Sequence, residues 1–420
     1  MPCSENANRK ILVISSKYPP EYAGSGLRAH RTYKRLLRKY GMQFDVLAGS
    51  VEFNSSAGYL YDGVSVRRIA CKIFGTAGYG ESEKKASFIS RLKLKADYIA
   101  ESVKVFFYLL GERGKYSLFH IFGNNNVTSA AVTFAKIFNI PAVLEVTMDT
   151  QSLYQREIFP VSFLWTGLPP RAHLVAISQR LKKECLRMGY PEEKIWCRPN
   201  PVDETRFFID REKRDSWRSR LSRFSPADIL LVNISKFIPR KNQIFLVEVL
   251  RHLPERYKLF LAGPFVGQGP LSLRDREYMD SILLRIRELR LEQRIEIKTG
   301  FVEDVSGYIK MADVFLFPTR HEGLGTPMLE SLACGIPVVA NKIEGVTDSW
   351  IKEGSNGYLS ILDPGVFAEK AEQAVLIPRE KLDVSSEEIL RHYSTASIDR
   401  EYADLLEKMG CAIKKPDKGD

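Results

Sequence analysis

The sequence of 420 residues contains no long uninterrupted apolar run. A membrane-spanning helix needs about 18 or more consecutive apolar residues, so we expect no spanning helix. The first ten residues, MPCSENANRK, also lack the apolar stretch of a secretory signal peptide. Together these absences favour a cytoplasmic protein, either free or peripherally bound at the inner face of a membrane.

Cysteine and histidine are both scarce, with six residues of each. No two cysteines form a Cys-x-x-Cys pair, so we expect free thiols in a reducing compartment. The histidines show no ligand spacing and the chain has no Asp-x-Asp triplet, so we expect no metal and no other cofactor. A Gly-x-Gly-x-x-Gly motif after the first predicted strand is also missing, which disfavours a dinucleotide-dependent oxidoreductase.

Positive charge is concentrated in the first half of the chain. Residues 1–200 contain 29 Lys and Arg against 16 Asp and Glu, whereas residues 201–420 contain 33 against 35. Residues 28–40 form a basic helix candidate, and residues 84–110 combine basic with apolar residues at helical spacing. The second segment suits an anionic membrane surface, although a solvated outer helix would look the same. No nucleic-acid-binding motif is present, so we expect no nucleic-acid partner.

Buried-strand patterns alternate with helical segments along the whole chain, which predicts an α/β protein with parallel sheets covered on both faces. Two prolines near residues 198–203 interrupt this pattern. We therefore expect one domain over residues 1–200, a second over 201–385, and a helix at 386–410 with a loose tail. The strand candidates are residues 10–15, 44–48, 64–69, 118–121, 142–146 and 174–177, then 229–234, 259–262, 295–298, 314–317 and 338–340.

Residues 321–357 are the most informative segment of the chain. Within it, Glu322 and Glu330 flank a glycine turn followed by Thr326-Pro327. Thr326 is a candidate N-cap and Pro327 a first-turn proline, so we expect a helix to begin here and to end before Gly335.

This helix has a neighbourhood suited to a ligand. The apolar run before it delivers Glu322 to the carboxyl end of a strand, where ligands of open α/β sheets bind. A helix amino terminus attracts phosphate, and the two carboxylates can accept hydrogen bonds from sugar hydroxyls. The pattern indicates a nucleotide-sugar site, while an ordinary structural turn ahead of a helix remains the alternative.

The segment resembles the E-x7-E signature of retaining family 4 glycosyltransferases, also called glycosyl transferases group 1, which have the GT-B fold. The resemblance extends over nearly the whole chain, including residues 15–26, 176–207 and 233–242. The positions in register are Pro318, Glu322, Gly323, Gly325, Glu330, Ala333, Gly335, Pro337, Val338, Val339, Ala340, Gly345, Asp348, Gly354, Gly357 and Leu359.

This resemblance implies two Rossmann-like domains facing each other across a cleft. The first domain, residues 1–200, would bind the acceptor, and the second, residues 201–385, would bind the nucleotide-sugar. The final helix and tail, residues 386–420, would cross back to the first domain.

The resemblance also implies roles for individual residues. Lys236 and Lys241 would meet the donor diphosphate. Lys236 stands where the family more often has arginine, and the adjacent Arg240 could compensate. Glu322 would face the hydroxyls of the donor sugar, and Glu330 the ribose. The remaining nucleotide-sugar contacts that it implies are Gly323, Leu324, Gly325, Thr326, Gly24, Gly26, Gly263 and Val302.

One catalytic feature of the family is missing. Many members end a strand of the first domain with a histidine that contacts the reacting sugar, and Thr147 or Met148 takes its place here. His120 matches the first member of another family histidine pair, although a lone histidine on a strand is commonly a packed core residue. Our catalytic candidates are Glu322, Asp149 and His120.

The function implied is retaining transfer of a sugar from a nucleoside diphosphate sugar, such as a UDP-sugar or GDP-sugar, to a hydroxyl acceptor. The basic first half favours a lipid-linked oligosaccharide or surface polysaccharide precursor as that acceptor. The missing histidine leaves a catalytically silent subunit as one alternative. Another GT-B enzyme, such as a phosphorylase or a nucleotide-sugar epimerase, is the other.

Overall fold

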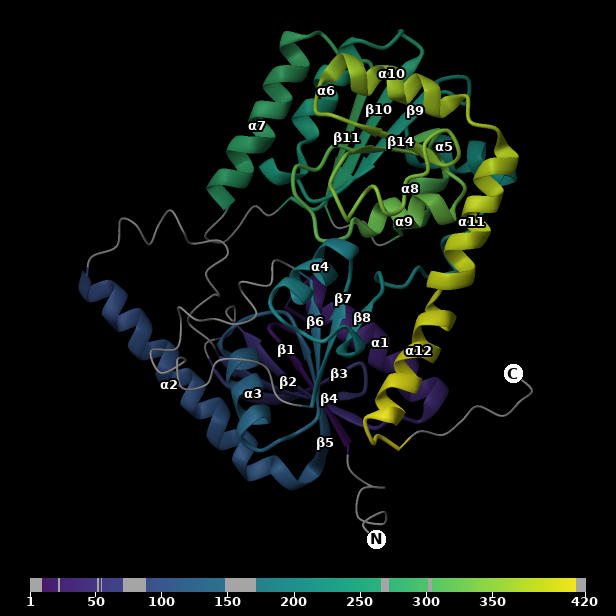
Figure 1. Cartoon of the computed structure of the whole chain (residues 1–420). Coiled ribbons are helices and arrows are strands. Elements are labelled where there is room, and N and C mark those ends of the chain that lie inside the picture. Colours follow the sequence, from purple (N-terminus) through teal and green to yellow (C-terminus); the bar gives the residue numbers. More distant parts are fainter. Residues whose placement is uncertain are drawn as a thin grey trace. The chain divides into compact units, whose positions relative to one another are not determined.

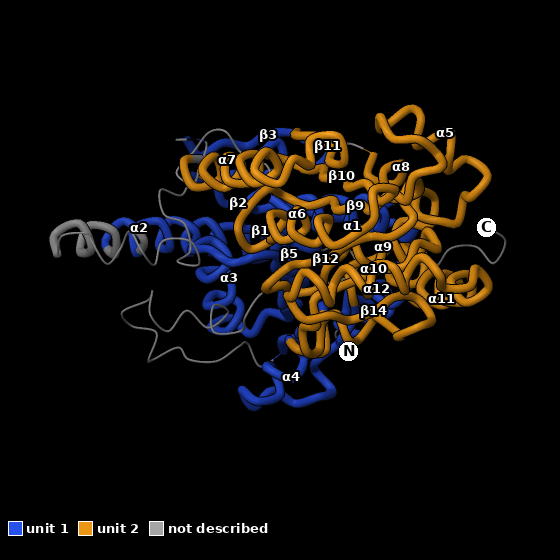
Figure 2. The backbone as a smooth tube through the Cα atoms, turned by 90° about the horizontal axis from the view of Figure 1, so that it is seen from above, with its two compact units in different colours: residues 1–177, 181–198, 399–420 blue, residues 178–180, 199–398 orange. Residues whose placement is uncertain are grey.

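The computed structural model describes residues 10–21, 23–50, 53, 55–70, 88–147, 171–265, 272–300 and 304–412. They form two compact units, which Figure 2 distinguishes by colour. Unit 1 comprises residues 1–177, 181–198 and 399–420, and unit 2 comprises 178–180 and 199–398. The chain therefore passes from unit 1 to unit 2 after Arg198, beside Pro199 and Pro201. It returns to unit 1 at Asp399, inside helix α12 (Thr395–Lys408). Asp149 and Val302 lie outside the described residues.

The sheet of unit 1 has the strand order β3-β4-β2-β1-β5-β6-β7-β8 among the described residues. Neighbouring strands pair in parallel, except that β3 pairs antiparallel with β4. The central strands are buried because helices cover both faces. The strands are β1 (Lys10–Ser15), β2 (Phe44–Ser50), β3 (Ala57–Tyr61), β4 (Val64–Ala70), β5 (Tyr116–Phe122), β6 (Ala142–Val146), β7 (Ala172–Ala176) and β8 (Ile195–Cys197).

The helices of unit 1 form two layers, visible on the two sides of its sheet in Figure 1. On one side α3 packs against β1 and β5, with α2 outside it. On the other side, Arg35 of α1 makes a bidentate ion pair with Asp399 of α12, at 2.7 and 2.9 Å. The helices are α1 (Gly24–Tyr40), α2 (Phe88–Glu112), α3 (Asn126–Ile137), α4 (Gln179–Arg187) and α12 (Thr395–Lys408); α4 and α12 begin in residues of unit 2.

Unit 2 has a parallel sheet in the order β11-β10-β9-β12-β13-β14 among the described residues. Its strands are β9 (Ile229–Ile234), β10 (Tyr257–Gly263), β11 (Ile295–Thr299), β12 (Val314–Phe317), β13 (Val338–Asn341) and β14 (Gly357–Ser360). The order reverses between β9 and β12, because β10 and β11 follow on one side and β13 and β14 on the other. The two loops that leave β9 and β12 therefore meet at a topological switch point.

Helices also cover unit 2 in two groups. One group consists of α6, α7 and α10, and the other of α5, α8, α9 and α11 (Figure 1). A continuous core of Leu, Val, Ile and Phe lies between the first group and the sheet. The helices are α5 (Arg214–Leu221), α6 (Gln243–Arg251), α7 (Ser272–Glu288), α8 (Val305–Lys310), α9 (Thr326–Ala333), α10 (Pro364–Val375) and α11 (Arg379–Tyr393).

The two-domain α/β prediction is confirmed, and several details were wrong. The short strands β3, β8 and β14 were not among the predicted strands. The predicted single helix at 386–410 is two helices, α11 and α12, which meet at Ser394 in an extended conformation. The break is fixed by Val202, whose N–H and C=O bond Tyr393 and Thr395. Glu204 then caps α12 by accepting hydrogen bonds from the backbone of Thr395 and Ala396.

Two glycines at the start of α1 allow a matched test of close packing. A Cβ atom on Gly26 would lie 2.4 Å from the carbonyl oxygen of Lys17, whereas one on Gly24 would meet nothing within 4 Å. We predict that Gly26→Ala lowers the free energy of unfolding by about 2 kcal/mol, because backbone must move to admit the methyl group. Gly24→Ala should leave it nearly unchanged. Urea denaturation followed by circular dichroism measures both, and equal midpoints would contradict the packing argument.

Candidate functional site

The switch point of unit 2 gathers charged side chains that are distant in sequence. The loop after β9 carries Lys236, Arg240 and Lys241, and the loop after β12 carries Glu322. Lys241 forms an ion pair with Oε2 of Glu322. Nη1 of Arg240 lies 3.1 Å from the same Oε2 and also donates a hydrogen bond to the carbonyl oxygen of His321 at 2.6 Å. Two cations therefore share one carboxylate, leaving excess positive charge between these loops.

Burial and the neighbouring charges shift the pKa values of Glu322 and Lys241. Burial by itself would raise the pKa of Glu322, but Lys241 and Arg240 outweigh it and hold that pKa below its usual range. Burial lowers the pKa of Lys241, and the charge of Glu322 offsets part of this. The carboxylate is thus charged at neutral pH, and Lys241 is a partly desolvated cation that gains from a further negative partner.

Lys236 belongs to the same loop but has a different partner. Its Nζ lies 3.4 Å from Oδ2 of Asp275, a fully buried carboxylate on α7. Sequence reasoning missed Asp275, because an Asp among the many charges of α7 gives no signal of its own.

The amino end of α9 lies beside Glu322. The predicted N-cap, Thr326, is wrong: Gly325 holds that position in the left-handed region, at φ 83°. A Cβ on Gly325 would lie 2.9 Å from the Phe317 ring, so both its conformation and its contacts favour glycine. The hydroxyl of Thr326 instead accepts a hydrogen bond from Asn200 at 3.0 Å.

This helix end offers donors to an anion. The N–H of Gly323 donates to Glu322 at 3.2 Å, whereas in the described part of the chain the N–H groups of Leu324 and Gly325 have no hydrogen-bond partner. Glu330 lies one turn into α9 and is half-buried. Free donors at the positive end of a helix, next to clustered cations, can bind phosphate.

Gly263, at the end of β10, sits beside the loop that leaves β9. A Cβ atom at this position would lie 2.0 Å from the carbonyl oxygen of Ser235, so only glycine allows the two backbones to come this close. We therefore attribute this glycine to packing beside the site.

The corresponding switch point in unit 1 lies between β1 and β5. Asn125 donates to the carbonyl of Ser16 at 2.7 Å, and the hydroxyls of Ser16 and Ser25 lie 3.2 Å apart. These contacts join the loop after β1 and the first turn of α1, which holds Gly24 and Gly26, to the loop after β5. Gly26 is needed there for the close approach to Lys17, and Gly24 stands in open space.

His120 lies in a buried polar network centred on Glu145 of β6. The Tyr33 hydroxyl bonds His120 Nδ1 at 2.7 Å. His120 and Glu145 are both fully or almost fully buried. Four side chains approach the carboxylate: His120 Nε2 at 3.2 Å, Arg198 Nη2 at 3.0 Å, Arg28 Nη2 at 3.5 Å and the Tyr402 hydroxyl.

This environment sets the charges in the network. Burial by itself would raise the pKa of Glu145, but Arg198 and Arg28 outweigh it and bring the value to about 2. Burial lowers the pKa of His120, which keeps the imidazole neutral. A neutral, inaccessible imidazole cannot contact a reacting sugar, so we revise His120 from a catalytic candidate to a packed core residue.

No metal site and no membrane-spanning element emerges from the described residues. They contain no group of three or more His, Cys, Asp and Glu side chains arranged to hold a metal ion. No helix among them is long and apolar enough to cross a bilayer.

Comparison with known proteins gives a consistent family. Residues 215–388 match the family model described as Glycosyl transferases group 1. The chain is 29% identical over 204 residues to the lipopolysaccharide core biosynthesis glycosyltransferase LpsE of Rhizobium meliloti, covering 47% of this chain and 53% of that protein. It is 30% identical over 167 residues to the GDP-mannose-dependent alpha-(1-6)-phosphatidylinositol monomannoside mannosyltransferase of Mycolicibacterium smegmatis, covering 38% and 41%. The chain thus spans about half the length of these curated relatives.

Solved structures extend the likeness to the whole fold. The structure of HepE from Anabaena in complex with UDP superposes with a TM-score of 0.71 and 17% identity, over 95% of this chain and all of that one. This likeness includes both units and shows a fold of the GT-B type.

The network around Glu145 gives a test by pH. The pKa of Glu145 is about 2 in the folded protein against 4.5 as its ordinary value, so its contribution to stability is present above pH 4.5 and is lost as the pH falls toward 2. We predict that Glu145→Gln lacks this contribution of about 3 kcal/mol. Urea denaturation of both proteins at several pH values measures the difference, with Glu193→Gln on the exposed surface as the control. A difference that does not change with pH would refute the assignment.

Proposed function

We propose that this chain, whose residues 215–388 match the family model of glycosyl transferases group 1, transfers a sugar from a nucleoside diphosphate sugar to a hydroxyl acceptor with retention of configuration. The observation that carries the proposal is the junction of Lys241, Arg240 and Glu322 at the amino end of α9. Cations and free backbone donors lie there beside carboxylates, which is what a sugar diphosphate requires.

The cations account for departure of the diphosphate. When the bond between the anomeric carbon and the phosphate oxygen breaks, negative charge grows on that oxygen. Lys241 and Lys236, together with the N–H groups of Leu324 and Gly325, stabilise this charge from fixed positions. This arrangement supplies the electrostatic role without a metal ion.

The carboxylates orient the donor. Glu322 is held charged by two cations and so accepts hydrogen bonds from sugar hydroxyls, while Glu330 accepts from the ribose. The acceptor oxygen forms its bond on the face that the diphosphate leaves, and its proton passes to the departing phosphate oxygen. This route requires no histidine, and Asp149 is our candidate for positioning the acceptor hydroxyl.

We propose a lipid-bearing acceptor, approached at an anionic membrane surface. The names of both curated relatives refer to lipid-bearing or lipopolysaccharide products. In α2, Val105 and Leu109 are buried, whereas Val103, Phe107 and Leu110 are exposed at helical spacing beside exposed Lys104. The sequence adds Arg91, Lys93 and Lys95 to the same helix. An apolar face with flanking cations fits an anionic bilayer.

A second candidate function is nucleotide binding without catalysis, as a partner subunit. The observation that favours it is that Thr147 or Met148 stands in place of the family's histidine. Donor hydrolysis or transfer by the purified protein separates the two functions, because a silent subunit binds nucleotide and turns nothing over.

Donor binding is tested by thermal shift against a panel of UDP-, GDP- and ADP-sugars. We predict that one donor raises Tm by several degrees when its concentration far exceeds its Kd. Lys241→Gln and Glu330→Gln should abolish most of this shift, because each removes a direct contact. Asp149→Ala should keep the shift and lose turnover.

Arg251→Gln is the matched control, because Arg251 is an exposed cation at the far end of α6 from the site. It should retain the full shift. A normal shift in Lys241→Gln would remove Lys241 from the phosphate site and with it the main support for the proposal.

Membrane binding is tested by co-sedimentation with vesicles of phosphatidylcholine with and without phosphatidylglycerol. We predict binding only to the anionic vesicles, and loss of most binding in Phe107→Ser combined with Leu110→Ser. The control is Leu376→Ser, which removes a side chain that is 78% exposed in unit 2. Equal binding by the double variant and the control would contradict a role for α2.

A further inference from the structure

A buried carboxylate faces one of the cations on the loop that leaves β9. Asp275, in the first turn of α7, is completely buried, and its Oδ2 lies 3.4 Å from Nζ of Lys236. Among the described residues this Oδ2 accepts no hydrogen bond, whereas Oδ1 accepts one from Arg274 at 3.1 Å. Burying a charge that lacks donors is costly, so Asp275 attracts the ammonium group of Lys236.

The ion pair leaves Lys236 able to bind a second anion. An ammonium group has three N–H donors, and the separation of 3.4 Å exceeds the about 2.7–2.9 Å of a strong charge-assisted hydrogen bond. The side chain of Lys236 is 34% exposed, whereas that of Asp275 is 0% exposed. The ammonium group therefore has a buried anion on one side and an accessible side from which a phosphate group can approach.

The backbone of this loop is supported by other residues. Gln243 donates hydrogen bonds to the carbonyl oxygen of Lys236 at 2.9 Å and to the hydroxyl of Ser235 at 2.8 Å. The hydroxyl of Tyr278, on α7, donates to Gln243 at 3.1 Å. The loop thus has support that is independent of Asp275, which contacts the side chain of Lys236.

The charges around the loop give this contact a consequence for a ligand. Lys236, Arg240 and Lys241 are three cations, and they pair with two carboxylates, Glu322 and Asp275. Arg240 and Lys241 share Glu322, so Asp275 is the anion that offsets Lys236. A negative charge this close to the ammonium group weakens the attraction between Lys236 and a phosphate group.

We propose, on the basis of the transferase function proposed above, that Asp275 is a positioning residue with two effects on the donor site. It fixes the ammonium group of Lys236 before the donor binds, so that this cation stabilises the departing diphosphate without first having to reorganise. Its own charge also weakens the hold on the nucleoside diphosphate product, which therefore leaves the site faster.

The main test compares Asp275→Asn with the unaltered protein, because asparagine keeps the shape of the side chain and removes its charge. Isothermal titration measures the Kd of UDP, GDP, ADP and pyrophosphate. For the compound that the unaltered protein binds most tightly, Asp275→Asn should lower Kd about tenfold. A merely structural role would raise Kd instead, because a disturbed loop binds phosphate less well.

Steady-state kinetics separate positioning from stability. With a sugar donor of the nucleotide that binds, Asp275→Asn should lower kcat without raising KM, because Lys236 is less well held and the product leaves more slowly. In a Lys236→Gln background, Asp275→Asn should cause no further fall in kcat, because its effect passes through that ammonium group. A further fall of the same size would overturn the positioning role.

A second comparison decides the proposal even where Asp275→Asn does not fold. Lys236→Gln and Arg240→Gln each remove one cation of the loop. The first leaves Asp275 without a cation from this loop, whereas after the second Glu322 keeps Lys241. Lys236→Gln should therefore raise the Kd of the nucleotide more than Arg240→Gln does, and equal losses would overturn the proposal.

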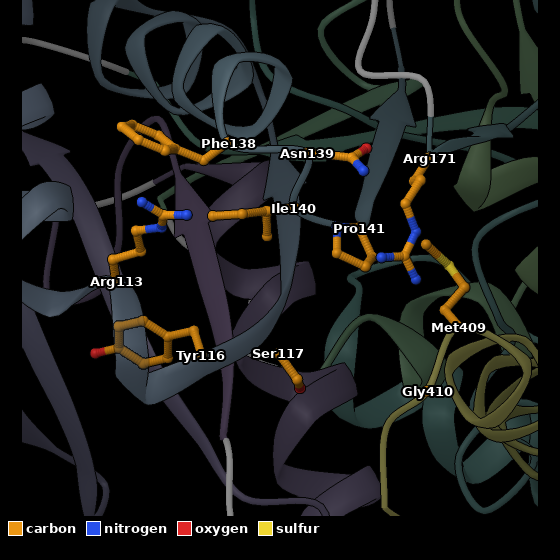
Figure 3. A pocket seen from close by; sticks show the side chains of 10 residues that line it. All are labelled: Arg113, Tyr116, Ser117, Phe138, Asn139, Ile140, Pro141, Arg171, Met409 and Gly410. Atoms are coloured by element: carbon orange, nitrogen blue, oxygen red, sulfur yellow. The ribbon is translucent and has the colours of Figure 1, made fainter. Parts of the chain in front are cut away.

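Two control variants should leave Kd unchanged. Asp280→Asn removes one negative charge from the exposed surface of the same helix α7. Arg113→Gln removes a cation from a hollow of about 250 Å³ in unit 1, where Arg113 and Arg171 lie at opposite ends with Ile140 and Pro141 between them (Figure 3). A raised Kd in Arg113→Gln would place the nucleotide in that hollow and overturn the donor site together with the role of Asp275.

The remaining outcomes distinguish this proposal from the function on which it rests. An unchanged or raised Kd in Asp275→Asn, with binding still lost in Lys241→Gln, would overturn the role of Asp275 and leave the proposed transferase intact. Absence of binding by all four compounds to the unaltered protein would overturn both.

Discussion

The ion pair between Lys241 and Glu322 ties together two loops that lie 81 positions apart in the sequence. It forms where the strand order of unit 2 reverses, so the sheet topology brings the loops near and the charges fix their contact. Partial burial makes this pair expensive in desolvation, and Arg240 offsets the cost by sharing the same carboxylate. The arrangement leaves the loop after β9 with more positive charge than Glu322 can neutralise. In the function proposed above, the diphosphate of the donor would supply the missing negative charge.

Different interactions join the loops at the switch points of the two sheets. In unit 1 the loops at the switch point are joined by Asn125, Ser16 and Ser25 through hydrogen bonds, and Gly26 lets backbones touch. The groups in these contacts are uncharged. The switch point of unit 2 is instead held by charges. A cluster of charges suits phosphate, whereas uncharged polar groups suit a carbohydrate or lipid acceptor, and this difference agrees with the roles proposed for the two units.

The sequence predicted the strands that are marked by their own apolar residues. It did not predict features that depend on contacts with residues distant in the sequence. The bounds of β1, β6, β9 and β12 were predicted because each is a mainly apolar run that is buried on both faces. Strands β3 and β14 are short and half-exposed, so no such run marks them. The motif around Glu322 predicted helix α9. Its N-cap is Gly325 and not Thr326, and a side chain at Gly325 would collide with the Phe317 ring. The assignment of His120 failed for the same reason, because Arg198 and Tyr402, far along the chain, enclose it.

The helix α12 starts in one unit and ends in the other, and this has a consequence for biosynthesis. Arg35 of unit 1 pairs with Asp399, which is synthesised 364 positions later. Glu145 accepts a hydrogen bond from Tyr402, which is synthesised 257 positions later. A ribosome delivers Asp399 and Tyr402 only after all the other segments of unit 1 up to residue 198 and the whole of unit 2 have been made. Unit 1 therefore cannot complete its interior until the segment that begins at Asp399 has emerged, and until then Arg35 lacks its partner Asp399. Unit 2, whose segments are nearly contiguous, has most of its interior available earlier, so the order of maturation is the reverse of the order of synthesis.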